Sequence, residues 1–317
     1  QLFPPMALLL MLLPLFKLDA LSVVFWPCML LVDLLAIALA AVTASLAAVG
    51  AVLVLTLVAT GVWVFHVPAT IAAAPSLLFV IGGFSFVFFG AGIFLARRLG
   101  ERLGGAATSA SAVFGDVRAQ LPAMSALLPF LLLIMMTQRL ALANPSAVFG
   151  LALVLALLVL GLAAVMEIEW LPACALAGVA GLEYSWRSQH PSVELPGVTL
   201  AWYLGFYALF VVYPFVFRRR FAAVTGPWVV AAIGGAAQFP LVYRLVIAAW
   251  PNHVPGVLPA LFAVAPLLSL VAILRCPPAA SEPAGDPARL NQLAIHGAVA
   301  LLFITLVFPI QFERQWL

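Results

Sequence analysis

Two ionisable side chains inside apolar stretches are the first candidates for chemistry in this sequence. Asp33 lies near the middle of FWPCMLLVDLLAIALAA, and Arg244 lies in AQFPLVYRLVIAAWP. A charged group at the centre of a bilayer costs about 2.5–3.5 kcal/mol on insertion scales, so each one needs an explanation. Asp33 is a candidate proton or cation site, with a structural hydrogen bond to a neighbouring helix as the alternative. Arg244 could bind an anionic head group or substrate, pair with Asp33 or Glu183, or extend its side chain to the interface.

A second set of candidate residues lies at the end of the apolar stretch that contains residue 183. Glu183, Arg187 and His190 could hold and turn over a lipid-linked phosphate, because arginine binds phosphate through two hydrogen bonds and histidine transfers protons. Their spacing matches no specific motif, and an ordinary polar loop is the competing explanation. The acidic pair Glu167 and Glu169 belongs to the same transferase hypothesis.

Small residues beside Glu183 carry a structural prediction. Ala173, Ala177 and Gly181 are spaced four apart, which is typical of a face that packs closely on a neighbouring helix. His296 is predicted to be a buried hydrogen-bonding group, because the four histidines show none of the spacings of a metal site. The three cysteines form no CxxC pair. The sequence therefore predicts neither a cofactor nor a metal.

The composition shows which elements must position these residues. Hydrophobic residues make up 66% of the 317 residues and charged residues 8%, and the mean hydropathy is +1.22. Soluble domains carry about 25% charged residues. The stretch LALVLALLVLGLAAV is apolar throughout, which is typical of a helix in lipid and not of a strand with period two. The predicted fold is an all-α, polytopic transmembrane helix bundle.

Apolar runs of about 20 residues divide the chain into about ten spans. A short apolar segment, 4–16, precedes them. The predicted spans are 21–42, 46–65, 75–96, 121–140, 147–166, 170–184, 199–217, 227–247, 256–274 and 290–310.

Basic residues predict the orientation of these spans. If the connection after the third span is cytoplasmic, nine of the 14 basic residues lie on that side, four lie on the other, and Arg244 lies within a span. This bias agrees with the positive-inside rule. It places the arginine-rich loops 97–119 and 218–225 in the cytoplasm and the chain in a bacterial cytoplasmic (inner) membrane. The basic residues thus set orientation, and no nucleic-acid partner is expected.

The chain is predicted to be a single integral membrane domain over 1–317. No connection is long enough to bury a core of its own, so no soluble domain is expected. Residues 75–166 and 199–274 show a parallel resemblance: the fourth and eighth spans each carry a central proline followed by an arginine. Such duplications occur in transporters.

Four stretches carry a family resemblance: LLPFLLLIMMTQRLALANPSAVFGLAL, FYALFVVYPFVFRRR, WPNHVPGVLPALFAVAPL and FPIQFERQWL. With these, the chain resembles a large bacterial family of uncharacterised polytopic membrane proteins, a domain-of-unknown-function family. Members are longer, so the resemblance implies that this chain is an internal fragment. Its expected partners are membrane lipids and further transmembrane segments of the parent chain. The family supplies no functional residues.

Three classes of function fit these patterns. A transporter- or channel-like bundle is favoured, because it would use the intramembrane Asp33 and Arg244. A membrane-embedded transferase acting on lipid-linked substrates, with Glu183, Arg187 and His190, is the alternative. A non-catalytic scaffold or assembly subunit is the third.

Overall fold

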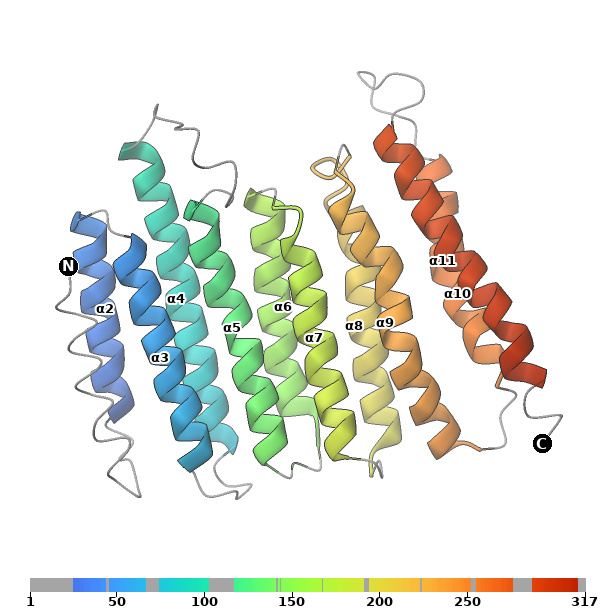
Figure 1. Ribbon diagram of the computed structural model, residues 1–317, viewed down its shortest axis with the longest axis horizontal. Helices are drawn as coiled ribbons and strands as arrows, with labels where there is room; N and C mark the ends of the chain where they lie inside the picture. The colour runs from blue at the N-terminus through green and yellow to red at the C-terminus, as the bar shows by residue number, and fades with distance from the viewer. Residues whose placement is uncertain are drawn as a thin grey trace. The chain divides into compact units, whose positions relative to one another are not determined.

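The computed structural model describes residues 25–43, 46–66, 74–102 and 117–312, apart from 141, 143, 167, 191–193, 223, 252–254 and 276–286. These described residues form ten helices and no strand (Figure 1). The helices are α2 (Phe25–Thr43), α3 (Leu46–His66), α4 (Ala74–Arg102), α5 (Val117–Arg139), α6 (Ser146–Met166), α7 (Leu171–Gln189), α8 (Pro196–Val216), α9 (Gly226–Ala249), α10 (Val257–Arg275) and α11 (Pro287–Phe312). The all-α prediction is confirmed for this part of the chain. The predicted segment 4–16 lies outside it.

Five of the described helices are long and apolar enough to cross a membrane. They are α6, α8, α9, α10 and α11. Helix α7 extends five residues beyond the predicted span 170–184, because the polar run SWRSQ continues the helix to Gln189. The structure thus supports a membrane protein through these five helices.

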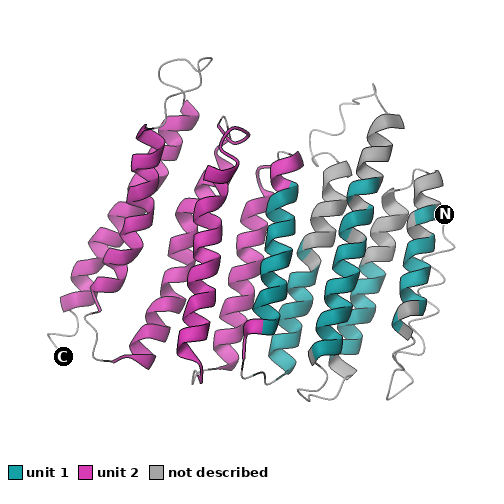
Figure 2. Ribbon diagram, turned by 180° about the vertical axis from the view of Figure 1, so that it is seen from behind, with its two compact units in different colours: residues 1–142, 147–162 teal, residues 143–146, 163–317 magenta. Residues whose placement is uncertain are grey.

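The chain divides into two compact units, each described separately (Figure 2). Unit 1 contains residues 1–142 and 147–162, and unit 2 contains residues 143–146 and 163–317. In unit 1, α5 packs against α3 and α4, and α2 packs against α3. In unit 2, α9 is central and packs against α7, α8, α10 and α11. The single domain and the parallel repeat stay predictions.

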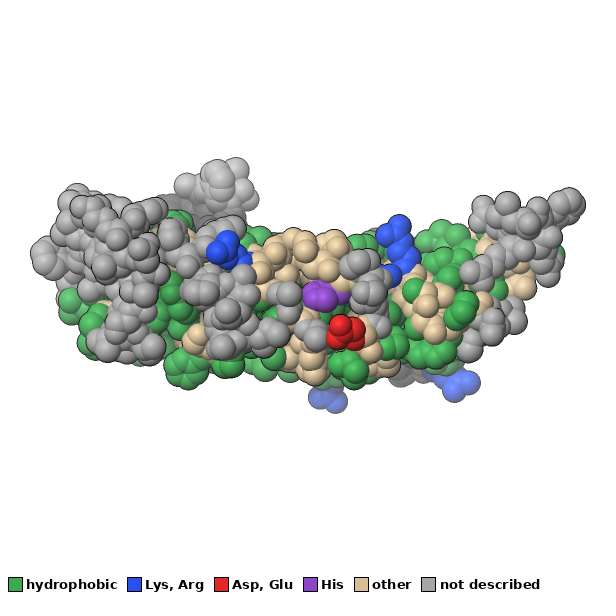
Figure 3. Space-filling model, turned by 90° about the horizontal axis from the view of Figure 1, so that it is seen from below, with side chains coloured by type: hydrophobic (Ala, Val, Ile, Leu, Met, Phe, Trp, Pro, Cys, Tyr) green, Lys and Arg blue, Asp and Glu red, His purple; other side chains and the backbone are tan. Residues whose placement is uncertain are grey.

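The distribution of side chains is that of a protein in lipid. Large apolar side chains lie on the outside: Phe79 is 80% exposed and Leu268 is 63% exposed. Figure 3, which looks onto one end of the helices, shows hydrophobic side chains together with a few charged ones among the described residues. Meanwhile the polar Asp33, Glu183 and Gln238 are completely buried. In water so much exposed apolar surface would drive association, whereas lipid chains solvate it.

Five tryptophans at or near helix ends follow two different patterns of exposure. Trp170 and Trp250, at helix ends, are exposed as an interfacial aromatic belt requires. Trp63, Trp186 and Trp228 are instead buried, because each packs against an aromatic or histidine ring of its own unit. Two of these five tryptophans thus have the exposure of an interfacial belt, and the other three pack inside their own units.

Candidate functional site

Glu183 lies on the buried face of α7, with no exposed surface. Val179 and Leu182 share this face, and α7 packs mainly against α9. The predicted small-residue stripe does not form this contact, since Ala173 and Ala177 are exposed. Larger side chains fill the inner side of α7 and leave the alanines outside. The face of α7 that packs inside unit 2 therefore carries a carboxyl group, and the two alanines lie on the exposed side.

Gln238 of α9 is the hydrogen-bond partner of Glu183. Its amide Nε2 donates to Oε2 of the carboxylate across 55 residues of sequence. Gln238 is fully buried and lies halfway along α9, a 24-residue helix long enough to cross a membrane. The Glu183–Gln238 pair thus joins two helices at the depth where an unpaired charge is most costly.

The second oxygen of each partner has no hydrogen-bond donor among the described residues. These atoms are Oε1 of Glu183 and Oε1 of Gln238. The carboxyl also forms no ion pair with any residue that the structure describes. A buried carboxylate without a cation is penalised by several kcal/mol of desolvation. Among the described residues, Glu183 therefore accepts a hydrogen bond at one oxygen, Oε2, and its Oε1 has no donor.

Two tyrosines border the pair. Tyr184 donates its hydroxyl to the carbonyl oxygen of Ala237 at 3.0 Å, a second polar contact between α7 and α9. Tyr203 of α8 is completely buried and lies within electrostatic range of Glu183 and Arg187. Side chains from α7, α8 and α9 therefore surround the carboxyl group.

Arg187 and His190 contact the end of their own helix. Nη1 of Arg187 donates to the carbonyl oxygen of His190 at 2.9 Å. The His190 ring stacks on Trp186 at 4.1 Å, and its Nδ1 lies 3.0 Å from the Trp186 carbonyl oxygen. Glu183 therefore bonds across to α9, whereas Arg187 and His190 each contact a carbonyl oxygen of the last turn of α7. Tyr203 lies within electrostatic range of both Glu183 and Arg187.

Asp33 forms a polar contact within unit 1. It is fully buried halfway along α2, and Oγ1 of Thr56 in α3 lies 2.9 Å from Oδ1 and 3.1 Å from Oδ2. Oγ1 of Thr60 in turn donates to the Thr56 carbonyl oxygen at 2.7 Å. Both oxygens of this carboxyl group thus face one hydroxyl from the neighbouring helix.

Arg244 lies exposed near the end of α9. It is within electrostatic range of Tyr184 but forms no ion pair with the described residues. Glu183, one predicted partner, accepts its hydrogen bond from Gln238 instead. Asp33, the other predicted partner, belongs to unit 1. Because Arg244 is exposed and close to the end of α9, the arrangement in which its guanidinium extends to the membrane interface is favoured.

The remaining predicted residues lie apart from the pair. Glu169 is exposed in the turn before α7, and Glu167 lies outside the described residues. His296 is buried in α11, with Nδ1 2.8 Å from the Gln292 carbonyl oxygen and Nε2 without a partner among the residues described. In the described part of the chain, no three His, Cys, Asp or Glu side chains come together.

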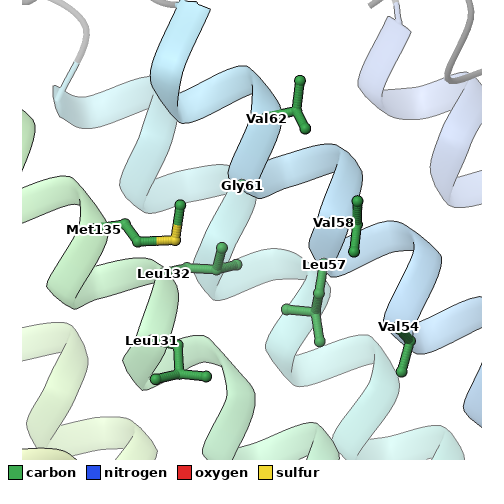
Figure 4. A pocket seen from close by; sticks show the side chains of 8 residues that line it. All are labelled: Val54, Leu57, Val58, Gly61, Val62, Leu131, Leu132 and Met135. Carbon is green, nitrogen blue, oxygen red and sulfur yellow. The ribbon is translucent and has the colours of Figure 1, made fainter.

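A groove of about 390 Å³ lies between α3 and α5 of unit 1 (Figure 4). Its lining side chains are all apolar: Val54, Leu57, Val58, Gly61, Val62, Leu131, Leu132 and Met135. The groove therefore offers no group that could bind a polar substrate or transfer a proton.

Three residues of these sites were not predicted: Gln238, Thr56 and Tyr203. All are uncharged, and the search for costly charges in apolar stretches passes over them. A usable signal exists, because Gln238 and Thr56 are isolated polar residues inside apolar runs, AAQFP and LVLTLV. In lipid such residues tend to bond across helices.

No family model, curated protein or solved structure matches this chain. Its function is therefore inferred from the buried Glu183–Gln238 pair and from the membrane setting.

Proposed function

We propose that this chain is a multi-pass protein of about ten spans in a bacterial cytoplasmic membrane, with loops 97–119 and 218–225 cytoplasmic. Beside the five apolar helices, the described helices α2, α3, α4, α5 and α7 have 19 to 29 residues. At 1.5 Å per residue, about 20 residues span the bilayer core of about 30 Å. The apolar outer surface and the arginine distribution support this orientation.

Within this setting, the protein is a proton-linked transporter, and Glu183 is its proton-binding residue. One observation carries this proposal: Glu183 is fully buried at mid-helix depth of α9, with one oxygen bound by Gln238 and the other without a donor among the described residues. Intramembrane carboxyl groups of this kind mark proton relays and ion pathways.

The chemistry of Gln238 fits a carboxyl group that changes its charge. An amide offers both a donor and an acceptor, so it can donate to a carboxylate and accept from a carboxylic acid. An arginine at this position would hold Glu183 permanently ionised. The protonated form is compatible with the closed α7–α9 contact. Loss of the proton places a charge in an apolar interior, which favours a rearrangement that admits water to the carboxylate.

Reconstituted protein tests this function directly. Liposomes containing the purified chain and an entrapped pH-sensitive dye receive a pH step, and the rate of proton entry is measured. We expect Glu183→Gln to reduce the rate to that of empty liposomes. Glu194→Gln is the matched control, because Glu194 is exposed in the connection before α8; it should leave the rate unchanged.

Infrared spectroscopy tests the protonation state without a known substrate. At neutral pH we expect a carbonyl stretching band of a protonated carboxyl group that disappears in Glu183→Gln and persists in Glu194→Gln. Proton entry that is unchanged in Glu183→Gln would refute the transport function. The same band in wild type and Glu183→Gln would show that another group carries the proton.

The transferase and scaffold hypotheses have no comparable observation. Arg187 and His190, the transferase candidates, bond to their own helix end. A transferase would lose turnover in Arg187→Ala or His190→Ala while its substrate is still detected in the membrane. A scaffold would tolerate all of these changes, including Glu183→Gln.

A further inference from the structure

One end of unit 2 carries a concentration of positive charge. Five arginines lie where α8 ends, where α10 ends and where α11 begins: Arg218, Arg219, Arg220, Arg275 and Arg289. Among the residues described at this end, Glu169 is the one acidic side chain. It belongs to this end because its carbonyl oxygen lies against Gly226, the first residue of α9.

Two hydrogen-bond contacts link the three chain segments that carry these arginines. Nε2 of Gln292 in α11 donates to the carbonyl oxygen of Ala222, two residues after Arg220, at 3.2 Å. Nη2 of Arg289, one turn earlier in α11, donates to the carbonyl oxygen of Ile273 at 3.1 Å. The first turns of α11 therefore contact both the segment after α8 and the end of α10.

The arginines divide into two groups by what they contact. Arg220 donates to the carbonyl oxygen of Ala164 at 2.7 Å, and Arg289 donates to the end of α10, so both bind backbone of their own unit. The other three form no ion pair with the described residues, and Arg219 and Arg275 are exposed. We name these three the arginine surface: Arg218, Arg219 and Arg275.

Exposed apolar side chains lie next to the arginine surface, at the ends of the same helices α8, α10 and α11. Val216 is 66% exposed, Leu274 61% and Leu290 58%. Each lies within two residues of an arginine of this end and at a terminus of a helix that can cross a membrane. A ligand that contacts both groups must carry an anion at one end and an apolar chain at the other.

We propose that the arginine surface binds the head group of an anionic phospholipid, whose acyl chains lie along the exposed side chains of α8, α10 and α11. Guanidinium groups bind phosphate oxygens through paired, charge-assisted hydrogen bonds. Arginines at membrane level attract anionic lipid by about fivefold in affinity each. The adjoining apolar residues select a lipid over a free phosphate ion. This site is separate from the proton-binding Glu183 and does not depend on it.

Lipid titration of the purified full chain tests the site. In neutral detergent micelles the chain is titrated with phosphatidylglycerol, phosphatidylcholine or inorganic phosphate, and bound molecules are counted by native mass spectrometry. We expect phosphatidylglycerol to bind preferentially. The double variant Arg219→Gln/Arg275→Gln should weaken its binding by about 25-fold, fivefold for each arginine. Phosphatidylcholine binding should not change.

Two further variants show whether a loss of phosphatidylglycerol binding is specific to the arginine surface. Arg244→Gln removes an exposed arginine of α9 away from this surface and should retain phosphatidylglycerol binding. Arg219→Lys/Arg275→Lys keeps the charge and should retain most of the affinity, which guards against a Gln variant that fails to fold. The proposal is overturned if phosphatidylglycerol binds no better than phosphatidylcholine, or if Arg244→Gln loses as much. It is also overturned if inorganic phosphate binds as tightly as the lipid, which would indicate a site for a free anion.

Discussion

The two units each bury a carboxyl group against a polar side chain of an adjacent helix, but the two pairs are built differently. In unit 1 both oxygens of Asp33 lie within hydrogen-bond distance of the Thr56 hydroxyl. In unit 2 Gln238 binds one oxygen of Glu183, and one oxygen of each residue has no donor among the described residues. All four side chains are at most 2% exposed.

This difference shows that burial of an acid in a membrane helix is not sufficient evidence for function. A carboxyl group whose two oxygens share the one hydrogen of a neighbouring hydroxyl stabilises the contact between its helices. A carboxyl group with a free oxygen beside an amide acceptor retains the capacity to exchange a proton. We therefore infer a structural role for Asp33 and a functional role for Glu183.

Proton entry into liposomes should separate the two acids by the largest margin. Glu183→Gln should abolish it, because an amide cannot take up the proton, whereas Asp33→Asn should retain most of the rate. The dye assay described for Glu183 measures both variants in one set of liposomes, with the amount of inserted protein as control. If Asp33→Asn abolishes flux and Glu183→Gln does not, the roles of the two sites are exchanged.

Removal of Gln238 tests whether Glu183 is neutral in the closed arrangement. Gln238→Met keeps the volume of the side chain and removes both its polar groups. With a neutral Glu183 we expect the free energy of unfolding to fall by about 2 kcal/mol, the cost of one buried unsatisfied group. An ionised Glu183 would raise this loss to about 3–5 kcal/mol. Denaturant unfolding in micelles measures the difference, and the larger value would contradict the protonated state.

Removal of the Asp33 partner should have a smaller effect. Thr56→Val deletes the hydroxyl that contacts both carboxyl oxygens, and we expect a loss of about 1 kcal/mol, typical of a polar contact between membrane helices. Thr60→Val is the matched control, because among the described residues the Thr60 hydroxyl bonds to a carbonyl oxygen of its own helix; it should change stability by less than about 0.5 kcal/mol. Equal losses in the two variants would mean that the Asp33–Thr56 contact contributes nothing specific.

The helical class, the membrane setting and the isolated acid Asp33 follow from sequence, because apolar length and the cost of charge are local properties. The Glu183–Gln238 pair does not follow, since it joins residues 55 positions apart and depends on which face of α7 turns inward. The spacing of Ala173, Ala177 and Gly181 predicts the wrong face. It fails because the volumes of Leu182 and its neighbours on the opposite side decide the packing.

Substitution of one glycine in each unit should give the smallest effects, and the two effects should differ in sign. In unit 2 a Cβ at Gly235 would lie 3.1 Å from Tyr207 Oη and 3.3 Å from Phe303, so Gly235→Ala should destabilise by about 0.5–1 kcal/mol despite its better helix propensity. In unit 1 a Cβ at Gly61 would lie 3.5 Å from the flexible end of Met135, in the groove of Figure 4. Gly61→Ala should therefore stabilise by up to about 1 kcal/mol. Unfolding in micelles measures both, and a stabilising Gly235→Ala would show that α9 is less tightly packed beside Gln238 than the structure indicates.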